Sequence, residues 1–307
     1  MNTAQSRPRV ALVGEGDQPA FATAVRDAGG DVVAPPDADA LVFGGDPALL
    51  SAALHDCVRW VQLTSAGVER LRAAGLIDDR REWLAARGVY AQAVAEWCLA
   101  MLLAGARSLP ARARAATWDR RPADRLLAGS TVGIVGAGGI GTRLIELLAP
   151  FPVRTVALTR SGREVPGASA SVGPDGLGDL LAEADSVVLL VPATDATRRL
   201  IGADELERMR PHAWLVNAGR GALVDTDALV AALRTGRIGG AALDVTDPEP
   251  LPDEHPLWSL PNAIVTPHIA NHEALSVEPM ARRIAENVER AATGRPLIGA
   301  VDAEAGY

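Results

Sequence analysis

The stretch "TVGIVGAGGIGTRL", residues Thr131–Leu144, sets the interpretation of the whole sequence. An apolar strand pattern leads into three glycines spaced G-x-G-x-x-G, and a helical pattern follows them. In a turn of this kind Gly136 permits the tight bend, Gly138 lets the backbone approach a pyrophosphate, and Gly141 lets the helix pack closely on the strand. The stretch therefore predicts a dinucleotide-binding unit in the second half of the chain.

The helix after these glycines strengthens that prediction. The N–H groups of Gly139 and Ile140 come at its N-terminus, where unpaired donors and the helix dipole favour an anion. A glycine turn without a ligand is the alternative, but the strand before it and the second strand after it favour a dinucleotide site. The matching turn of the first half, "VGEGDQP", has Pro19 in place of the third glycine and two acids, so we assign it no phosphate.

Composition and charge limit the class of protein. With 307 residues, 48% of them apolar and 22% charged, the chain is long enough for two globular domains. The formal net charge of -8 offers no basic surface, so we expect neither nucleic acid nor membrane as a partner. Two cysteines are too few for a disulfide framework or a cysteine zinc site, and we predict no metal.

The apolar segments indicate a protein of the cytoplasm. The first residues lack the long apolar stretch of a signal peptide. The longest apolar run, "WCLAMLLAGA", is shorter than the ~20 residues that a membrane span needs, so we interpret it as a buried helix.

Strand and helix patterns alternate in both halves, which predicts an α/β protein with two doubly wound parallel sheets. We expect a flavodoxin-like domain from residues 1–95 and 276–307, and a Rossmann cofactor domain from residues 96–275. The closing helix, from about Ala281 to Ala292, should pack back on the first domain.

Polar residues at the predicted strand ends carry the candidate chemistry, because ligands of open α/β sheets bind beyond the carboxyl ends of the strands. "WLVNAGRGALVD" supplies Arg220, "GAALDVTDPEPLP" supplies Asp244 and Glu249, "AIVTPHIAN" supplies His268, and "SVVLLVPAT" supplies Pro192. A guanidinium and an imidazolium aimed at one oxygen would stabilise the negative charge that develops when hydride adds to a keto carbon.

Five motifs in this order, "TVGIVGAGGIG", "VPATDATRRLI", "VNAGRGALVD", "ALDVTDPEPLP" and "NAIVTPHIA", resemble the NAD(P)-dependent D-isomer-specific 2-hydroxyacid dehydrogenases, of glyoxylate/hydroxypyruvate reductase type, over about residues 88–275. The resemblance implies that Arg220 holds the substrate carboxylate and keto oxygen, that His268 donates the proton, and that Glu249 pairs with His268. Each could instead be structural: a loop brace, a turn residue or a buried histidine. His272 is the rival proton donor.

The resemblance also implies roles for a second set of residues. Asp244 would accept a hydrogen bond from the nicotinamide carboxamide, with a loop brace as the equally weighted alternative, and Pro192 would line the cofactor. "LTSAGVE" resembles the loop whose N–H groups bind the substrate carboxylate, which implicates Ser65, Ala66 and Gly67 in a flavodoxin-like substrate domain. A simple glycine turn is the alternative there.

The residues after the second Rossmann strand bear on the choice of cofactor. NAD-preferring sites place Asp or Glu about 20 residues past the glycines, on the adenosine ribose. This chain has Thr159 there, followed by Arg160, Ser161 and Arg163. Hydroxyl and guanidinium donors suit a 2′-phosphate, so we predict NADP, with NAD as the alternative. The arginines could also merely solvate a loop.

Three departures from the family pattern leave the substrate open: Tyr90, Thr246 and Asn271 stand where asparagine, an aromatic residue and a small residue are frequent. We expect an oxidoreductase that interconverts a small 2-keto acid and its D-2-hydroxy acid. Phosphite or formate dehydrogenase chemistry, and a dinucleotide-sensing protein like the corepressors of the superfamily, are the alternatives. The family also suggests a homodimer, with "ATWDRRPADR", residues 116–125, as a possible arm between subunits.

Overall fold

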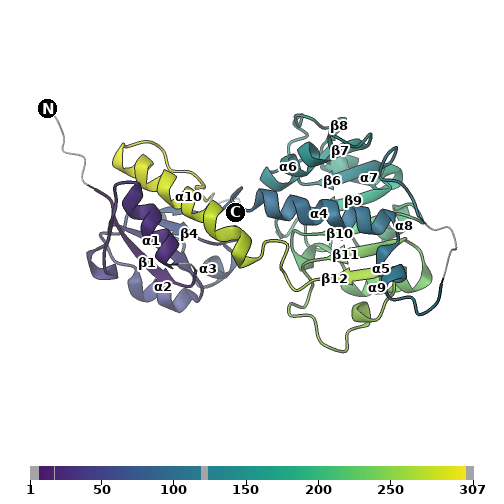
Figure 1. Cartoon of the computed structure of the whole chain (residues 1–307), viewed down its shortest axis with the longest axis horizontal. Coiled ribbons are helices and arrows are strands. Elements are labelled where there is room, and N and C mark those ends of the chain that lie inside the picture. The colour runs from purple at the N-terminus through teal and green to yellow at the C-terminus, as the bar shows by residue number, and fades with distance from the viewer. Residues whose placement is uncertain (1–6, 17, 119–123, 302–307) are drawn as a thin grey trace. The chain divides into compact units, whose positions relative to one another are not determined.

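A computed structural model describes residues 7–16, 18–118 and 124–301, and divides the chain into two compact units (Figure 1). Unit 1 comprises the chain up to Tyr90 together with the chain from His272 onward, and unit 2 comprises Ala91–Asn271. The predicted boundaries fell after residues 95 and 275. Residues 119–123 of the possible arm lie outside the described residues.

Unit 1 is built on five parallel strands in the order β2-β1-β3-β4-β5. The strands are β1 (Arg9–Gly14), β2 (Asp31–Val32), β3 (Ala40–Gly44), β4 (Trp60–Leu63) and β5 (Glu82–Leu84). The helices are α1 (Gln18–Asp27), α2 (Pro47–Ala53), α3 (Glu69–Ala73) and α10 (Glu273–Ala292), with a short 3-10 turn, η1 (Pro35–Asp37). The order reverses beside β1, so the predicted flavodoxin-like topology is confirmed.

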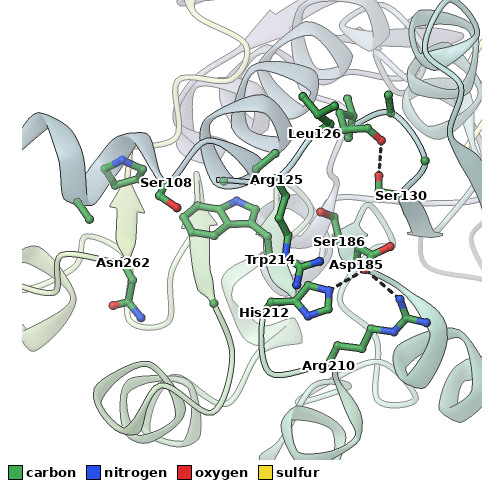
Figure 2. A pocket seen from close by; sticks show the side chains of 18 of the residues that line it. Ser108, Arg125, Leu126, Ser130, Asp185, Ser186, Arg210, His212, Trp214 and Asn262 are labelled. Carbon is green, nitrogen blue, oxygen red and sulfur yellow. Dashed lines mark hydrogen bonds and ion pairs between the residues drawn. The ribbon is translucent and has the colours of Figure 1, made fainter. Parts of the chain in front are cut away.

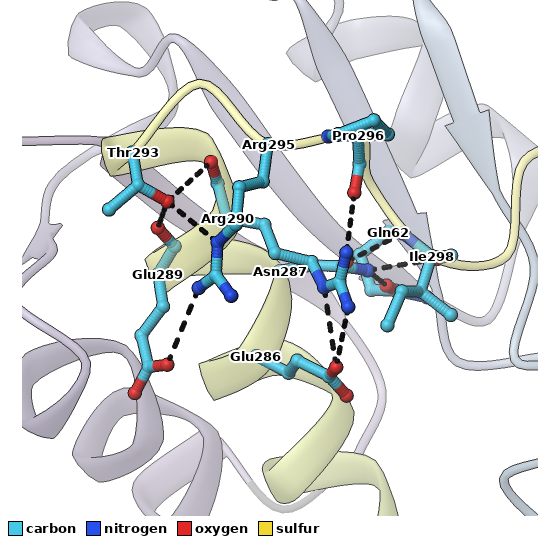
Figure 3. Close-up of polar contacts among 9 residues, drawn as sticks. All are labelled: Gln62, Glu286, Asn287, Glu289, Arg290, Thr293, Arg295, Pro296 and Ile298. Atoms are coloured by element: carbon cyan, nitrogen blue, oxygen red, sulfur yellow. Dashed lines mark hydrogen bonds and ion pairs between the residues drawn. The ribbon is translucent and has the colours of Figure 1, made fainter.

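Helix α10 belongs to unit 1, where it packs against α1 (Figure 1). Its apolar side chains Met280, Ile284 and Val288 are buried in one cluster with residues of β1 and α1. Near its end Asn287, which is fully buried, donates to Gln62 Oε1 of β4 at 2.7 Å and to the Ile298 carbonyl at 3.0 Å (Figure 3). This amide therefore ties the closing helix and the segment after it to the sheet.

Unit 2 is built on seven parallel strands in the order β12-β11-β10-β9-β6-β7-β8. They are β6 (Thr131–Val135), β7 (Arg154–Leu158), β8 (Ala170–Val172), β9 (Ser186–Leu189), β10 (Trp214–Asn217), β11 (Gly240–Leu243) and β12 (Ala263–Val265). The helices are α4 (Ala91–Ala106), α5 (Leu109–Ala113), α6 (Gly139–Leu148), α7 (Leu177–Glu183), α8 (Ala203–Arg208) and α9 (Thr226–Thr235), with 3-10 turns η2 (Pro174–Gly176), η3 (Gly221–Leu223) and η4 (Pro256–Trp258). The order reverses between β6 and β9, so the predicted Rossmann topology is confirmed.

Glycines let helices pack closely on both faces of the unit 2 sheet. A side chain at Gly133 would collide with Leu180 of α7, whereas its neighbour Ile134 lies beside Gly141 of α6, so α7 and α6 cover opposite faces. Helix α4, which carries the longest apolar run, packs beside α6 and buries Val94, Cys98 and Leu102. Within the described residues no helix combines the length and apolarity that a membrane crossing requires.

Candidate functional site

The glycine-rich loop follows β6 at the point where the strand order reverses, and its three glycines meet three different constraints. Gly136 has φ +104°, a conformation that side chains rarely adopt. A Cβ at Gly141 would lie 2.3 Å from the Gly136 carbonyl oxygen, so helix α6 approaches the loop as only glycine allows. A Cβ at Gly138 would meet nothing within 4 Å, so this position faces open space.

Helix α6 begins on that open side of the loop. Gly139 and Ile140 are its first two residues, and N–H groups at these positions have no acceptor within their own helix. Gly138 and Gly139 are both exposed. The loop thus offers backbone donors, a favourable helix dipole and room for a phosphate group to approach.

The end of β7 carries the residues that we associated with the adenosine ribose. Thr159 is 7% exposed, and its hydroxyl is buried without a hydrogen-bond partner in the described part of the chain. Arg160 and Ser161 are exposed. Arg163 Nη2 donates to the Ala137 carbonyl at 3.0 Å, so its guanidinium lies against the glycine-rich loop.

Arg220 follows β10 in a loop that a buried side chain holds. Asn217, fully buried at the end of β10, accepts from the Gly219 N–H at 3.1 Å and donates to the Arg220 carbonyl at 2.9 Å. Arg220 Nη1 donates to the Gly219 carbonyl at 2.8 Å. We did not single out Asn217 from the sequence; a polar residue closing an apolar strand was the only signal.

Asp244 follows β11 and is 3% exposed. Its Oδ1 accepts from Thr266 Oγ1 at 2.6 Å and from the Ile269 N–H at 2.8 Å, and its Oδ2 accepts from the Ala270 N–H at 2.9 Å. Its backbone carbonyl accepts from the His268 N–H at 2.8 Å. Asp244 therefore bonds to residues on both sides of His268.

His268 and Glu249 meet at the same edge of the sheet. The carboxylate Oε1 of Glu249 lies 2.7 Å from His268 Nδ1. In this contact Nδ1 donates its proton to the carboxylate oxygen, which leaves Nε2 to face a ligand. The side chains are 54% and 44% exposed, so a ligand can reach the imidazole. His272 differs, because it stands at the N-cap of α10 in unit 1, where its Nδ1 accepts from the Ala274 N–H at 3.3 Å.

The Ser65–Gly67 loop lies in unit 1, directly after β4. The N–H groups of its three residues donate to no described residue, whereas Ser65 Oγ donates to the Gly67 carbonyl at 2.8 Å. The Tyr90 hydroxyl donates to the Thr64 carbonyl beside the loop. The Ser65–Gly67 loop thus offers three consecutive backbone donors.

Pro192 lies in unit 2, where it follows β9, and its carbonyl accepts from Thr197 Oγ1 at 2.7 Å.

A pocket of about 720 Å³ lies at the opposite, amino edge of the unit 2 strands and contains none of the predicted site residues (Figure 2). Asp185 is one of the polar residues that line it, and it accepts from His212 Nε2 at 2.7 Å and from Arg210 Nη1 at 2.9 Å. The second carboxylate oxygen accepts from the Thr131 N–H at 2.8 Å. The carboxylate therefore joins the beginnings of β6 and β9 to the segment before β10.

We expect Asp185→Asn to lower the free energy of unfolding by about 1–3 kcal/mol at pH 7, because charged hydrogen bonds are lost. Burial alone would raise the pKa of Asp185, but the hydrogen bonds from His212, Thr131 and Arg210 lower it below its usual value. The carboxylate thus contributes stability above pH ~3.9, the pKa of an unfolded aspartate, and loses it as the pH falls through the lower folded value.

Urea unfolding at pH 7 and at steps down to about pH 3 tests this expectation. The difference between wild type and variant should shrink in the most acidic samples. Asp253→Asn, at an exposed position, is the control and should leave the midpoint unchanged. Equal midpoints for wild type and Asp185→Asn at pH 7 would contradict the stabilising role.

Residues 98–270 match the family model described as "D-isomer specific 2-hydroxyacid dehydrogenase, NAD binding domain". An uncharacterized protein of Corynebacterium melassecola is 42% identical over 276 residues, which cover 88% of this chain and 90% of that protein. A glyoxylate reductase of Aeropyrum pernix is 39% identical over 219 residues, which cover 68% of this chain and 65% of the reductase.

Solved structures resemble the whole chain. A D-isomer specific 2-hydroxyacid dehydrogenase from Xanthobacter autotrophicus Py2, in complex with NADPH and MES, is 29% identical with a TM-score of 0.87, covering 98% of this chain and 100% of the other. The NADPH-dependent glyoxylate/hydroxypyruvate reductase from Sinorhizobium meliloti, in complex with NADP and sulfate, is 25% identical with a TM-score of 0.83 and the same coverage.

Proposed function

The chain belongs to the D-isomer specific 2-hydroxyacid dehydrogenase family, and from that premise we propose that it reduces a small 2-keto acid of the glyoxylate or hydroxypyruvate type with NADPH. The observation that carries the proposal is the 2.7 Å contact between His268 and Glu249, at the sheet edge where Arg220 also emerges. A proton donor and a cation together suit an oxygen that gains negative charge.

The glycine-rich loop of unit 2 fits a dinucleotide. Its open glycine, Gly138, and the N–H groups that begin α6 leave room and donors for a pyrophosphate. When bound, the reduced nicotinamide supplies a hydride to the keto carbon. We assign cofactor binding to Gly136, Gly138, Gly139, Ile140, Gly141, Thr159, Arg160, Ser161, Pro192 and Asp244.

The substrate and the proton are assigned to the chain's own polar groups. Arg220 holds the carboxylate and keto oxygen of the acid, since a planar guanidinium offers two parallel donors. As the keto carbon gains the hydride, Nε2 of the protonated His268 gives its proton to the oxygen, and the ring becomes neutral. Glu249 orients the ring through its contact with Nδ1. The three N–H groups of Ser65, Ala66 and Gly67 suit a carboxylate.

Mixing the protein with NADPH and a panel of 2-keto acids, and following the nicotinamide absorbance, tests the proposal. Turnover of glyoxylate or hydroxypyruvate supports it. Tight NADPH binding without turnover of any keto acid would instead favour a dinucleotide sensor, and NADP⁺ reduction by phosphite or formate would favour those dehydrogenases. The homodimer and its place in the cytoplasm stay predictions. Sedimentation of the purified chain measures the oligomeric state.

We expect NADPH to exceed NADH by at least about tenfold in kcat/KM, a difference of ~1.4 kcal/mol. Arg160 and Ser161 are exposed after β7, Arg163 lies against the glycine-rich loop, and Thr159 stands where an NAD site has a carboxylate, so guanidinium and hydroxyl groups follow this strand in place of an acid. Arg160→Ala should reduce the preference, chiefly through weaker NADPH binding, and added salt should weaken NADPH more than NADH.

Steady-state rates with NADPH and with NADH measure the preference in kcat/KM, and titrating the protein with each cofactor while following tryptophan fluorescence measures the Kd. Arg154→Ala is the matched control, because Arg154 begins the same strand at the opposite edge of the sheet, where it pairs with Glu183. This control should bind both cofactors as the wild type does. A preference for NADH that persists at low salt would overturn the assignment.

A further inference from the structure

We infer that Asn217 positions Arg220, and that Asp244, together with Thr266, positions His268, so that two buried side chains at neighbouring strand ends fix the acid relative to the cation. The inference rests on the proposed function. It gives Asp244 a role within the chain itself, whether or not it also contacts the cofactor.

Asn217 controls the loop of Arg220 through the backbone. Its side-chain amide bonds the N–H of Gly219 and the carbonyl of Arg220, and the carbonyl of Gly219 accepts from the Arg220 guanidinium. The guanidinium bonds the carbonyl of the Gly219–Arg220 peptide bond. One fully buried side-chain amide therefore holds the N–H before this peptide bond and the carbonyl after it. Without it, an N–H and a carbonyl in a buried turn lose their partners, and the loop can shift to find others.

The next loop is held by the opposite arrangement, in which one carboxylate collects donors. Asp244 accepts from Thr266 Oγ1 and from the N–H groups of Ile269 and Ala270. His268 lies between these donors with φ +54°, the left-handed region that non-glycine residues enter at a cost. The bonds on both sides of His268 stabilise this conformation and so aim its ring.

The Arg220 loop and the His268 loop are both held by residues at the ends of the paired strands β10 and β11, and these residues bond to each other. The Asp244 N–H donates to the Asn217 carbonyl at 3.0 Å, which continues the pairing of β10 with β11 beyond the strands. In addition, Gly221 lies so close to the segment after Asp244 that a Cβ there would come within 1.9 Å of the Thr246 carbonyl oxygen. A displacement of ~1 Å can reduce turnover about 10²-fold, so this shared frame matters for catalysis.

Asn217→Ala and Thr266→Val test the inference, because neither side chain is assigned to bind a ligand. We expect Asn217→Ala to raise the KM for glyoxylate and to lower kcat, with a loss of about tenfold or more in kcat/KM. We expect Thr266→Val to lower kcat by roughly 3–10-fold, with the Kd for NADPH unchanged. Thr266→Ser keeps the hydroxyl and should restore most of the wild-type rate.

Two matched controls separate positioning from general stability. Asn262→Ala removes a side-chain bond to the Leu233 carbonyl, and Thr155→Val removes one from the Ser169 N–H, both at the amino edge of the same sheet. They should lower Tm as the test variants do and leave kcat/KM within about twofold. If the controls lose as much activity as Asn217→Ala and Thr266→Val, the inferred positioning of Arg220 and His268 is wrong.

Amide hydrogen exchange of the cofactor-free protein provides a readout that does not depend on turnover. Exchange should accelerate at Gly219 in Asn217→Ala and at Ile269 and Ala270 in Thr266→Val. Unchanged exchange at these amides overturns the inference even if the rates fall. A weaker Kd for NADPH with unchanged kcat in Thr266→Val also overturns it and leaves Asp244 with cofactor binding as its only role. A wild-type chain without turnover contradicts the proposed function alone, since exchange still tests the positioning.

Discussion

His268→Ala loses about 10²–10⁴-fold in reductase turnover and binds NADPH as tightly as the wild type, which is the range that general acid catalysis contributes. Only the proton donor is removed, because the ring is 54% exposed and contacts Glu249 rather than the glycine-rich loop. Steady-state rates with glyoxylate and a fluorescence titration of NADPH measure the two quantities.

A second variant and a control make this result interpretable. Asn tolerates the left-handed backbone better than Ala does, so His268→Asn keeps the loop conformation while it removes the acid. His272→Ala is the control and should retain its turnover, because His272 caps α10. If His268→Asn turns over near the wild-type rate while His272→Ala does not, the proton comes from His272.

Arg220→Lys is expected to lose about 10²-fold in kcat/KM although it keeps the charge, because lysine cannot supply two parallel donors to the carboxylate and keto oxygen. The loop itself should survive, since Asn217 bonds the backbone of residues 219 and 220 and not the guanidinium. Kinetics with glyoxylate give KM and kcat separately, and the loss should appear in both.

The matched control is Arg199→Lys, an exposed arginine of the same unit whose Nη1 lies 3.5 Å from Asp225. Exposed ion pairs contribute little, so this variant should keep wild-type kinetics. Wild-type values of KM and kcat in Arg220→Lys would make the arginine structural, and the substrate site would then have to be assigned elsewhere.

Much of the fold follows from local patterns. The alternation of strands and helices predicted two doubly wound sheets, and the strand orders of both units confirm that architecture. The glycine spacing predicted the turn from β6 into α6, because tight turns and close helix contacts demand glycine at fixed positions, and this turn lies where the strand order reverses. The family resemblance is likewise confirmed, by the match over residues 98–270.

The sequence by itself determined which residue types stand at the strand ends, and it paired Glu249 with His268 only through a family resemblance. Only the tertiary structure decided that Asp244 bonds to Thr266, Ile269 and Ala270, and that Asn217 spans the Arg220 loop. The physical reason is distance along the chain: parallel strands bring together residues whose spacing follows no local period. Periodicity reports which face of an element is buried, whereas a buried polar group finds its partner only when two loops meet.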